Sequence, residues 1–246
     1  MAKLPPILFD DWDDSPRARR MVAGLGRAEV QVWLAALPPG EAALTGLSPL
    51  LSPEECQRAE RFSVSEPRRQ FVFGRVCLRQ ILGACLGREP ASLVLERQPH
   101  GKPCLAWPEG GDADLRFNLS HSGRRLAIAL ARGRDVGVDL EQIQPLKEEA
   151  LLAGRIFSPR EQAEWRSLPE AQQRTAFFNG WTRKEAWLKA TGEGLTDDLA
   201  AIEVTLAPGK DAAWLALPGG LPVGREWAVR ALPLPPDYAG AVVFRR

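Results

Sequence analysis

The stretch RFNLSHSGRRLAIALARGRDVGVDLE, residues 116–141, decides the fold, because the spacing of its apolar residues is that of β-strands. Strands are predicted over residues 116–120, 126–131 and 135–141. Turn-forming residues separate them at Ser122-Gly123 and at Gly133-Arg134-Asp135. We therefore expect a mainly antiparallel sheet in the middle of the chain.

Helices are predicted on both sides of this sheet. Two stretches, residues 52–55 and 158–161, read Ser-Pro-x-Glu, with serine as the N-cap, proline at the first helical position and glutamate completing a capping box. A long helix is expected over about residues 67–86, and a helical region over residues 146–191 with breaks near residues 159 and 169. Residues 1–28 are interpreted as an irregular leader. Further strands are predicted at residues 29–37, 93–95, 201–206, 213–217, 226–232 and 239–244.

The order of strands and helices occurs twice along the chain. It predicts an α+β protein of two similar halves, residues 29–133 and residues 134–246, each with a helix packed on a mainly antiparallel sheet. The repeated Ser-Pro-x-Glu helix start is a faint further hint of duplication.

Charge and composition exclude some functional classes. The 246 residues contain 32 basic and 31 acidic side chains, so a general nucleic-acid binder, which needs a basic excess, is not expected. No stretch approaches the roughly 20 apolar residues that cross a bilayer, and the N-terminus lacks the pattern of a secretory signal. We therefore expect a cytoplasmic protein with no membrane segment. Its four cysteines form no CxxC pair and are interpreted as buried thiols.

Two carboxylates, Asp139 and Glu141, are predicted to point to the same face of the strand at residues 135–141, about 7 Å apart. Such a pair can share a hard cation such as Mg²⁺. Taken alone, the D-x-E pattern is more typical of a solvated strand face. Its meaning therefore depends on the neighbouring motifs.

A second motif is NGWTRKEAWLKATGEGL, residues 179–195, which is predicted to be a helix that stops at its glycines. Glu185 and Lys189 are four residues apart and share one face of this helix. They form either a surface salt bridge, or a third carboxylate for the cation with an ammonium group that binds a phosphate.

A third motif is Phe117–Gly123 at the end of a strand, where Ser120 and His121 with local backbone N–H groups can cradle an anion. The alternative is a turn whose hydroxyls bond their own backbone. A serine hydrolase is disfavoured, because adjacent serine and histidine on a strand point to opposite faces and no G-x-S-x-G motif is present. Lys102, in the turn at residues 100–103, is by itself a plain exposed lysine.

These motifs, in this order, resemble the Sfp-type 4'-phosphopantetheinyl transferase family. The family's G-K-P turn, F-N-[LIV]-S-H-S, G-[VI]-D-[LIV]-E and W-x-x-K-E-[AS]-x-x-K-x-x-G-x-G motifs correspond to residues 101–103, 117–122, 137–141 and 181–194. The resemblance implies a monomer of two pseudo-twofold-related α+β halves with the active site in the cleft between them. It also implies an enzyme that moves the phosphopantetheine arm of coenzyme A to a serine of an apo carrier protein and releases 3',5'-ADP.

The resemblance further implies roles for individual residues. Mg²⁺, or Mn²⁺ in its place, would be held by Asp139, Glu141 and Glu185. From the chemistry that the transfer requires, Glu185, directly or through a metal-bound water, is the candidate general base, and Lys189 and His121 with Mg²⁺ would offset charge on the pyrophosphate. Coenzyme A would contact Lys102, Pro103, Ser120, His121, Lys189, Arg58 and Arg69. Glu55 stands where some relatives carry a basic residue, so Arg58 or Arg61 would compensate near the 3'-phosphate.

Two alternatives are kept beside the transferase. The first is another Mg²⁺-dependent phosphoester or nucleotide hydrolase that uses the same carboxylates. The second is a non-catalytic carrier-binding module of the same fold, which would be expected to have lost some of Asp139, Glu185 or Lys189. For the carrier protein, we expect residues 144–157, with their mixed apolar and basic side chains, to form part of the docking surface.

Overall fold

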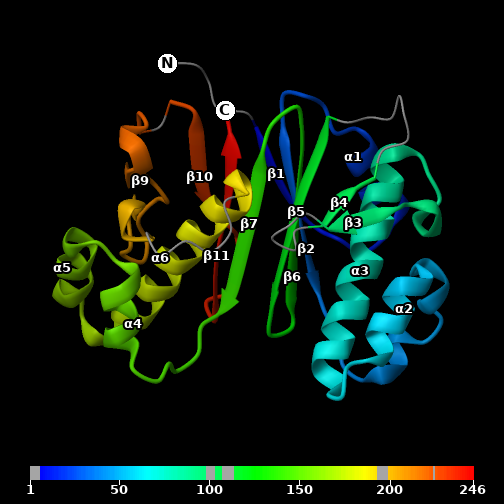
Figure 1. Ribbon diagram of the computed structural model, residues 1–246, viewed down its shortest axis with the longest axis horizontal. Helices are drawn as coiled ribbons and strands as arrows, with labels where there is room; N and C mark the ends of the chain where they lie inside the picture. The colour runs from blue at the N-terminus through cyan, green and yellow to red at the C-terminus, as the bar shows by residue number, and fades with distance from the viewer. Residues whose placement is uncertain (1–5, 98–102, 107–113, 193–198, 224) are drawn as a thin grey trace.

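The structure, a computed structural model, describes residues 6–97, 103–106, 114–192, 199–223 and 225–246. Figure 1 shows the strands together in the middle of the molecule, with helices covering both outer sides. The helices are α1 (Pro16–Ala23), α2 (Pro53–Glu60), α3 (Ser65–Leu86), α4 (Glu149–Ile156), α5 (Pro159–Ser167) and α6 (Glu170–Thr191). The short 3₁₀ helices are η1 (Glu41–Leu44), η2 (Ser48–Leu50), η3 (Pro90–Ser92), η4 (Leu199–Ala201) and η5 (Pro218–Gly220).

The strands form two main sheets and two small hairpins. The first sheet has the order β1-β2-β6-β5 and the second has the order β10-β11-β7, while β3 pairs with β4 and β8 with β9. The strands of the main sheets are β1 (Ile7–Asp11), β2 (Val30–Ala36), β5 (Leu115–Ser122), β6 (Arg125–Arg132), β7 (Val136–Gln142), β10 (Trp227–Ala231) and β11 (Tyr238–Arg245). The hairpin strands are β3 (Leu95–Arg97), β4 (Pro103–Leu105), β8 (Glu203–Val204) and β9 (Trp214–Ala216).

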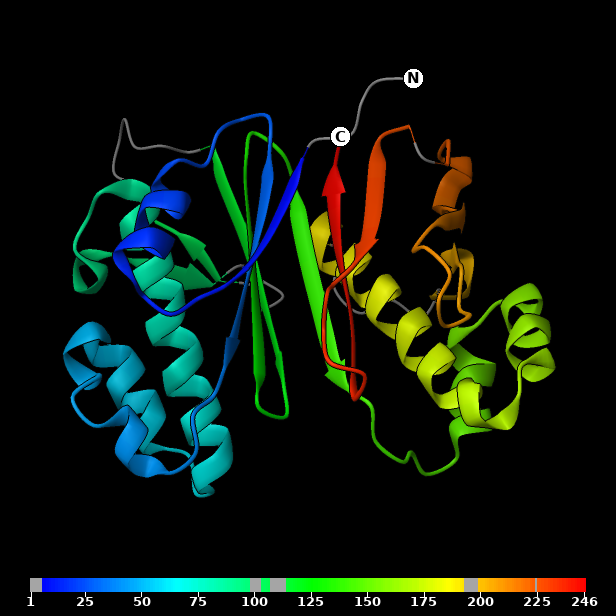
Figure 2. The same ribbon diagram turned by 180° about the vertical axis from the view of Figure 1, so that it is seen from behind.

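Three larger hydrophobic cores hold these layers together, and a smaller fourth packs α2 against α3. One lies between the two sheets and is built by β2, β6, β7, β10 and β11. A second packs α1 and α3 against the first sheet, and a third packs α4, α5 and α6 against the second sheet. The order of layers is therefore helices, sheet, sheet, helices, as Figures 1 and 2 show from opposite sides.

The two halves repeat one arrangement. The strand order β2-β6-β5 recurs as β7-β11-β10, with antiparallel pairing throughout. Both first strands read Val-x-Val-x-Leu, at residues 30–34 and 136–140, and these apolar side chains meet in the core between the sheets. The α+β fold of two similar halves is therefore confirmed.

In the described part of the predicted leader, residues 6–28, the chain forms a strand and a helix, so the prediction of an irregular segment was wrong there. β1 pairs with β2 in parallel, and α1 begins at Ser15, whose side chain accepts a hydrogen bond from the Ala18 N–H. The five-residue strand alternates, with Ile7 and Phe9 against the core between the sheets and Leu8 against the helical core. The polar residues around this short segment hide its alternation.

Helix starts and stops follow the predicted signals. Both Ser-Pro-x-Glu stretches form complete capping boxes, at Ser52 and at Ser158. α6 ends at Gly192, whose φ of 78° lies in the left-handed region that glycine adopts without strain. All four cysteines are free thiols. Among the described residues, we find no helix with the length and apolar character that a membrane span needs.

Candidate functional site

β5 and β7 lie side by side where the two halves meet, although they belong to different sheets (Figures 1 and 2). Side chains of every second β5 residue join them. The β7 backbone N–H groups donate from Val138 to Asn118 Oδ1 (2.8 Å), from Leu140 to Ser120 Oγ (3.4 Å) and from Gln142 to Ser122 Oγ (3.1 Å). Because strand residues two apart share a face, the asparagine and the two serines replace the backbone carbonyls that a sheet would supply. We call these three residues the polar joint.

Asp139 is the centre of the candidate site. Its Oδ1 atom accepts hydrogen bonds from Ser120 Oγ (2.8 Å) and Lys189 Nζ (2.6 Å). The Lys189 ammonium also donates to Ser120 Oγ at 3.1 Å. Residues from both halves, on β5, β7 and α6, therefore converge on one buried carboxylate. The Lys189 ammonium pairs with Asp139 across to β7, which favours the functional interpretation of the Glu185–Lys189 motif over a surface salt bridge.

The Ser120 hydroxyl is fully used by the protein. It donates to Asp139 and accepts from Leu140 N–H and from Lys189, and a hydroxyl has one hydrogen and two lone pairs to offer. Ser120 therefore orients Asp139 and Lys189 in this structure instead of presenting its hydrogen to an anion.

Ser122 does for Glu141 what Ser120 does for Asp139, and the sequence analysis missed this role. Its Oγ atom lies 2.6 Å from Glu141 Oε2 and accepts from Gln142 N–H. Because the N–H occupies a lone pair, the hydroxyl hydrogen is directed at the carboxylate. The spacing of two from Ser120 was the available signal, because it puts both serines on the same strand face.

The three acidic side chains of the site all have raised pKa values. Burial is the largest cause for Asp139, Glu141 and Glu185, and it raises the pKa of each carboxyl above its ordinary value. The neighbouring Asp139 charge adds to this for both glutamates, while the Lys189 ammonium opposes it. Three carboxylates against one ammonium leave the cluster short of positive charge.

Two buried carboxylate oxygens, Asp139 Oδ2 and Glu185 Oε1, have no hydrogen-bond partner among the described residues. Unpartnered oxygens of this kind fit a hard cation. No group of three acidic, histidine or cysteine side chains in the described part of the chain is already arranged as a metal cage. Mg²⁺ commonly binds through one or two carboxylates plus water and substrate phosphates, so an open acidic cluster fits Mg²⁺.

Gly137 lets α6 approach β7. A Cβ atom at this position would come closer than 3.0 Å to the Ala186 carbonyl oxygen and to the backbone of Ala190. The helix that carries Glu185 and Lys189 therefore rests directly on the strand that carries Asp139. The glycine of the G-V-D-L-E motif thus has a packing role beside the carboxylates.

The remaining residues of the predicted site lie around this centre. His121 follows Ser120 on the opposite strand face and is exposed at its surface; the protein around its ring, and then the Lys189 charge, lower its pKa. Pro103 and the end of α6 line a pocket of about 360 Å³ that contains residues of both halves, among them Arg116, Asp135 and Thr191. Lys102 lies outside the described residues.

Arg58 and Arg69, the two arginines predicted to contact coenzyme A, lie in different surroundings. Arg58 lies 4.8 Å from the centre of the Phe71 ring and lines a pocket of about 480 Å³ with Arg75. Arg69 instead donates to Glu66 and to the Pro38 carbonyl, and it does not line this pocket.

Glu55 has a structural partner that accounts for the acidic residue at this position. Its carboxylate accepts from Arg79 Nε at 2.7 Å, forms the capping box with Ser52 and lies 3.7 Å from Arg75.

Comparison with known proteins identifies relatives over most of the chain. Residues 36–132 match the family described as "4'-phosphopantetheinyl transferase, N-terminal", and residues 135–241 match the "4'-phosphopantetheinyl transferase superfamily". The chain is 40% identical over 215 residues to the 4'-phosphopantetheinyl transferase HetI of Nostoc sp. (strain PCC 7120), covering 87% of this chain and 86% of that protein. It is 30% identical over 156 residues to the 4'-phosphopantetheinyl transferase Sfp of Bacillus subtilis (strain 168), covering 63% and 66% of the two chains. A solved ACPS–CoA complex of Chronobacterium ammoniagenes aligns with 46% of this chain and 96% of its own, with 26% identity and a TM-score of 0.34.

Proposed function

Because the chain belongs to the 4'-phosphopantetheinyl transferase superfamily, we propose that it moves the phosphopantetheine arm of coenzyme A to a serine of an apo carrier protein. The observation that carries the proposal is the convergence of Ser120 from one half with Asp139 and Lys189 from the other, at 2.6–3.1 Å. A non-catalytic relative would have no reason to keep a buried carboxylate with an orphaned oxygen beside that ammonium.

Coenzyme A binds between the halves in this proposal. Its pyrophosphate lies near Lys189, whose side chain is 29% exposed and is the cation of the cluster. Pro103 is on the same approach, since it lines the pocket shared by both halves. Lys102, outside the described residues, is kept as a proposed contact of coenzyme A. The 3'-phosphate is assigned to the pocket at Arg58. Because Glu55 is acidic, the second cation of this pocket is Arg75.

Mg²⁺ is assigned to Asp139, Glu141 and Glu185, the three acidic side chains of this cluster, all with raised carboxyl pKa values. When bound, the cation neutralises charge on the pyrophosphate oxygens and draws them toward the acidic strand. The protein's own contribution is to hold two of the carboxylates by serine hydroxyls, Ser120 on Asp139 and Ser122 on Glu141. Mn²⁺ has the same ligand preference and is an acceptable substitute.

The transfer step forms a bond between the carrier serine oxygen and the β-phosphorus and breaks the bond from that phosphorus to the oxygen of 3',5'-ADP. Lys189 and His121 stand beside the pyrophosphate, and Lys189 offsets its charge. The serine proton passes to Glu185, whose carboxylate lies in the same acidic cluster as Asp139 and Glu141.

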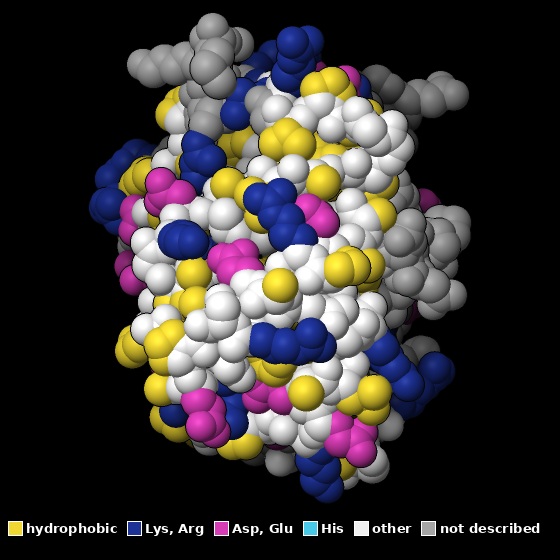
Figure 3. All heavy atoms as spheres, turned by 90° about the vertical axis from the view of Figure 1, so that its left-hand side faces the viewer, with side chains coloured by type: hydrophobic (Ala, Val, Ile, Leu, Met, Phe, Trp, Pro, Cys, Tyr) yellow, Lys and Arg dark blue, Asp and Glu magenta, His cyan; other side chains and the backbone are white. Residues whose placement is uncertain are grey.

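The carrier protein docks at residues 144–157 in this proposal. Leu151 on α4 is 51% exposed and Arg155 is exposed beside it, whereas Phe157, which the prediction included, is buried in the core and does not take part. Basic, acidic and apolar side chains are interspersed over the side of the molecule that carries α4 and α5 (Figure 3). Recognition of an acidic carrier therefore rests on a few residues such as Arg155. We also propose that the protein is a cytoplasmic monomer and that it binds neither nucleic acid nor membrane.

One assay tests the function. Wild type and the Glu185→Gln variant are incubated with coenzyme A, Mg²⁺ and several apo carrier proteins, and each carrier is weighed by mass spectrometry. The expected result is a gain of one phosphopantetheine group with wild type and almost none with Glu185→Gln. Phosphate or AMP released without a carrier would support the hydrolase instead. Intact coenzyme A with every carrier would leave a binding module as the better description.

A further inference from the structure

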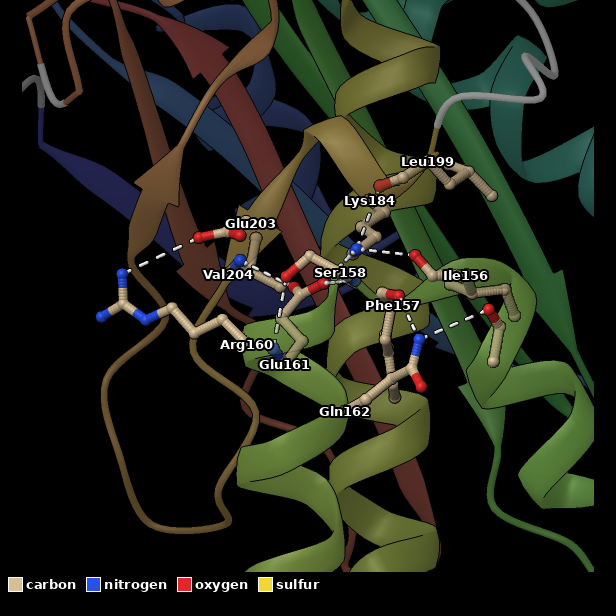
Figure 4. A network of polar contacts seen from close by, with 11 residues as sticks. Ile156, Phe157, Ser158, Arg160, Glu161, Gln162, Lys184, Leu199, Glu203 and Val204 are labelled. Carbon is tan, nitrogen blue, oxygen red and sulfur yellow. Dashed lines mark hydrogen bonds and ion pairs between the residues drawn. The ribbon is translucent and has the colours of Figure 1, made fainter.

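Lys184 is fully buried and is bonded on all three of its N–H groups. Its ammonium donates to the Ile156 carbonyl (2.8 Å), to Glu161 Oε2 (2.6 Å) and to the Leu199 carbonyl (3.0 Å), as Figure 4 shows. An ammonium has three hydrogens, so none is left unsatisfied. One side chain of α6 is therefore tied to the end of α4, to α5 and to η4.

Glu161 extends this network to two further segments. Its Oε2 atom also accepts from Ser158 N–H at 2.9 Å, and its Oε1 atom accepts from Val204 N–H at 2.9 Å (Figure 4). Both side chains of the Lys184–Glu161 pair have 0% exposure. Burial raises the pKa of Glu161 and lowers that of Lys184, so each charge depends on the other. We call this pair with its backbone acceptors the buried clamp.

A buried ion pair can often be replaced by hydrocarbon without loss of stability, so stability alone does not account for the clamp. Hydrocarbon side chains at these positions would not hold the helix at one fixed rotation about its own axis. Neighbouring helical residues are about 100° apart, so fixing Lys184 on one side of α6 also fixes the direction of Glu185. Lys189, on the same face as Glu185, is fixed with it.

The N-terminal half contains the same device, which lines the pocket assigned to the 3'-phosphate. Glu55, the capping-box glutamate of α2, accepts from Arg79 of α3 at 2.7 Å. Arg79 then donates to the carbonyls of Pro90 and Leu93, as Lys184 donates to that of Leu199. The residue after Arg79 is Gln80, where the residue after Lys184 is Glu185.

We propose that Lys184 and Glu161 are positioning residues of the transferase site, and that they set the rotation of α6 at which Glu185 and Lys189 face Asp139. This inference rests on the proposed function and assigns the lysine of the K-E pair a role in orientation. Neither residue touches substrate.

The test compares three forms of the whole chain: wild type, Lys184→Met/Glu161→Gln, and Arg79→Met/Glu55→Gln as the matched control. Both double variants remove a buried ion pair and leave a capping box that glutamine completes. For all three forms, Tm is measured without metal and at rising Mg²⁺. For wild type and Lys184→Met/Glu161→Gln, kcat and KM for coenzyme A are also measured at saturating Mg²⁺. The control is compared by its Mg²⁺ response alone, because Glu55 and Arg79 line the pocket assigned to the 3'-phosphate.

We expect both double variants to fold, with similar losses of Tm. Only the Lys184→Met/Glu161→Gln form should need about 10–100-fold more Mg²⁺ for half of its rise in Tm, with a comparable fall in kcat, because supporting residues of a metal site have effects of this size. Its KM for coenzyme A should stay within about threefold, because a binding contact is not removed. The milder Glu161→Gln variant carries the same test with a smaller shift if the double variant does not fold.

Two results would overturn the positioning role. One is a Lys184→Met/Glu161→Gln form with the Mg²⁺ response and kcat of wild type, and the other is an equal loss of the Mg²⁺ response in the control. A wild-type chain that modifies no carrier refutes the proposed function, while the rise in Tm with Mg²⁺ still tests the clamp.

Discussion

Replacing Gly137 by alanine is expected to separate the two elements that build the site. The new Cβ would lie closer than 3.0 Å to the Ala186 carbonyl oxygen, to Ala190 N and to Ala190 Cα, which are backbone atoms of α6 and do not rotate away. Ordinary contact starts at 3.4 Å, so α6 must move from β7 by about 1 Å. Overpacking of this kind costs about 1–3 kcal/mol.

The stability and the activity should respond differently to this change. For a chain of this size, about 2 kcal/mol lowers Tm by roughly 4–8 °C. A displacement of about 1 Å at a catalytic group costs up to about 100-fold in rate, so we expect kcat to fall by about that factor. Tm by calorimetry and kcat from the mass gain of the carrier check the two values on the same protein.

Gly74 offers a matched control, because it lies inside α3 and a Cβ there would meet only Leu126 Cδ1 at 3.8 Å. Gly74→Ala should leave kcat unchanged and raise stability by about 0.5–1 kcal/mol, as expected when alanine replaces glycine in a helix. A Gly137→Ala protein with wild-type kcat would show that the spacing of α6 from β7 does not set the site. Equal losses of kcat in both variants would have the same meaning.

Three further outcomes follow from the described contacts. Ser122→Ala should raise the half-saturating Mg²⁺ concentration about tenfold, because Glu141 loses its hydroxyl donor, whereas Ser122→Thr should keep this concentration near that of wild type. Titration of Tm against Mg²⁺ measures both concentrations, and equal values for the two variants would contradict the role of Ser122. Removal of Mg²⁺ by EDTA should lower the Tm of wild type but not that of Asp139→Asn, and a wild-type Tm that EDTA leaves unchanged would argue against a metal at this cluster. Arg155→Glu should raise the KM for an acidic carrier about tenfold and leave the KM for coenzyme A unchanged. Steady-state kinetics measure both constants, and an unchanged KM for the carrier would show that the carrier docks elsewhere.

The local features of the fold could be predicted from the sequence because each depends on a few neighbouring residues. The capping boxes at Ser52 and Ser158 and the stop at Gly192 are of this kind. β1 and α1 were missed because the strand is short and α1 has a serine cap and a proline but no glutamate at the third position, where Ala18 stands. Only pairing with β2 and packing on α3 make this segment regular.

The site was predicted where residue type decides the chemistry and missed where tertiary contacts decide it. Asp139 and Lys189 were selected as a carboxylate and a cation, and the structure brings them within 2.6 Å. The spacing of two puts Ser122 on the strand face of Ser120 but does not show which strand that face meets. Nothing in the local pattern shows that Lys184 meets Leu199, fifteen residues further on. Those contacts exist only once distant segments have been folded together.

The Arg79–Glu55 pair corresponds to the buried clamp at Lys184, which aligns α3 with α6. The Val-x-Val-x-Leu sequences align β2 with β7. In this alignment, Trp33, Ala35 and Gln80 of the first half stand at the places of Asp139, Glu141 and Glu185. Trp33 and Ala35 are buried in the helical core instead of facing a ligand.

The N-terminal segment covers this second set of positions. β1 lies along β2 much as β5 lies along β7, and Trp12 packs edge-on against Trp33 at 5.5 Å and donates to Gln80. The described part of the chain thus repeats the scaffold but has the acidic cluster of the proposed site in one half alone. We therefore expect one coenzyme A per chain and no half-of-the-sites behaviour within it, because the place of a second centre has become hydrophobic core.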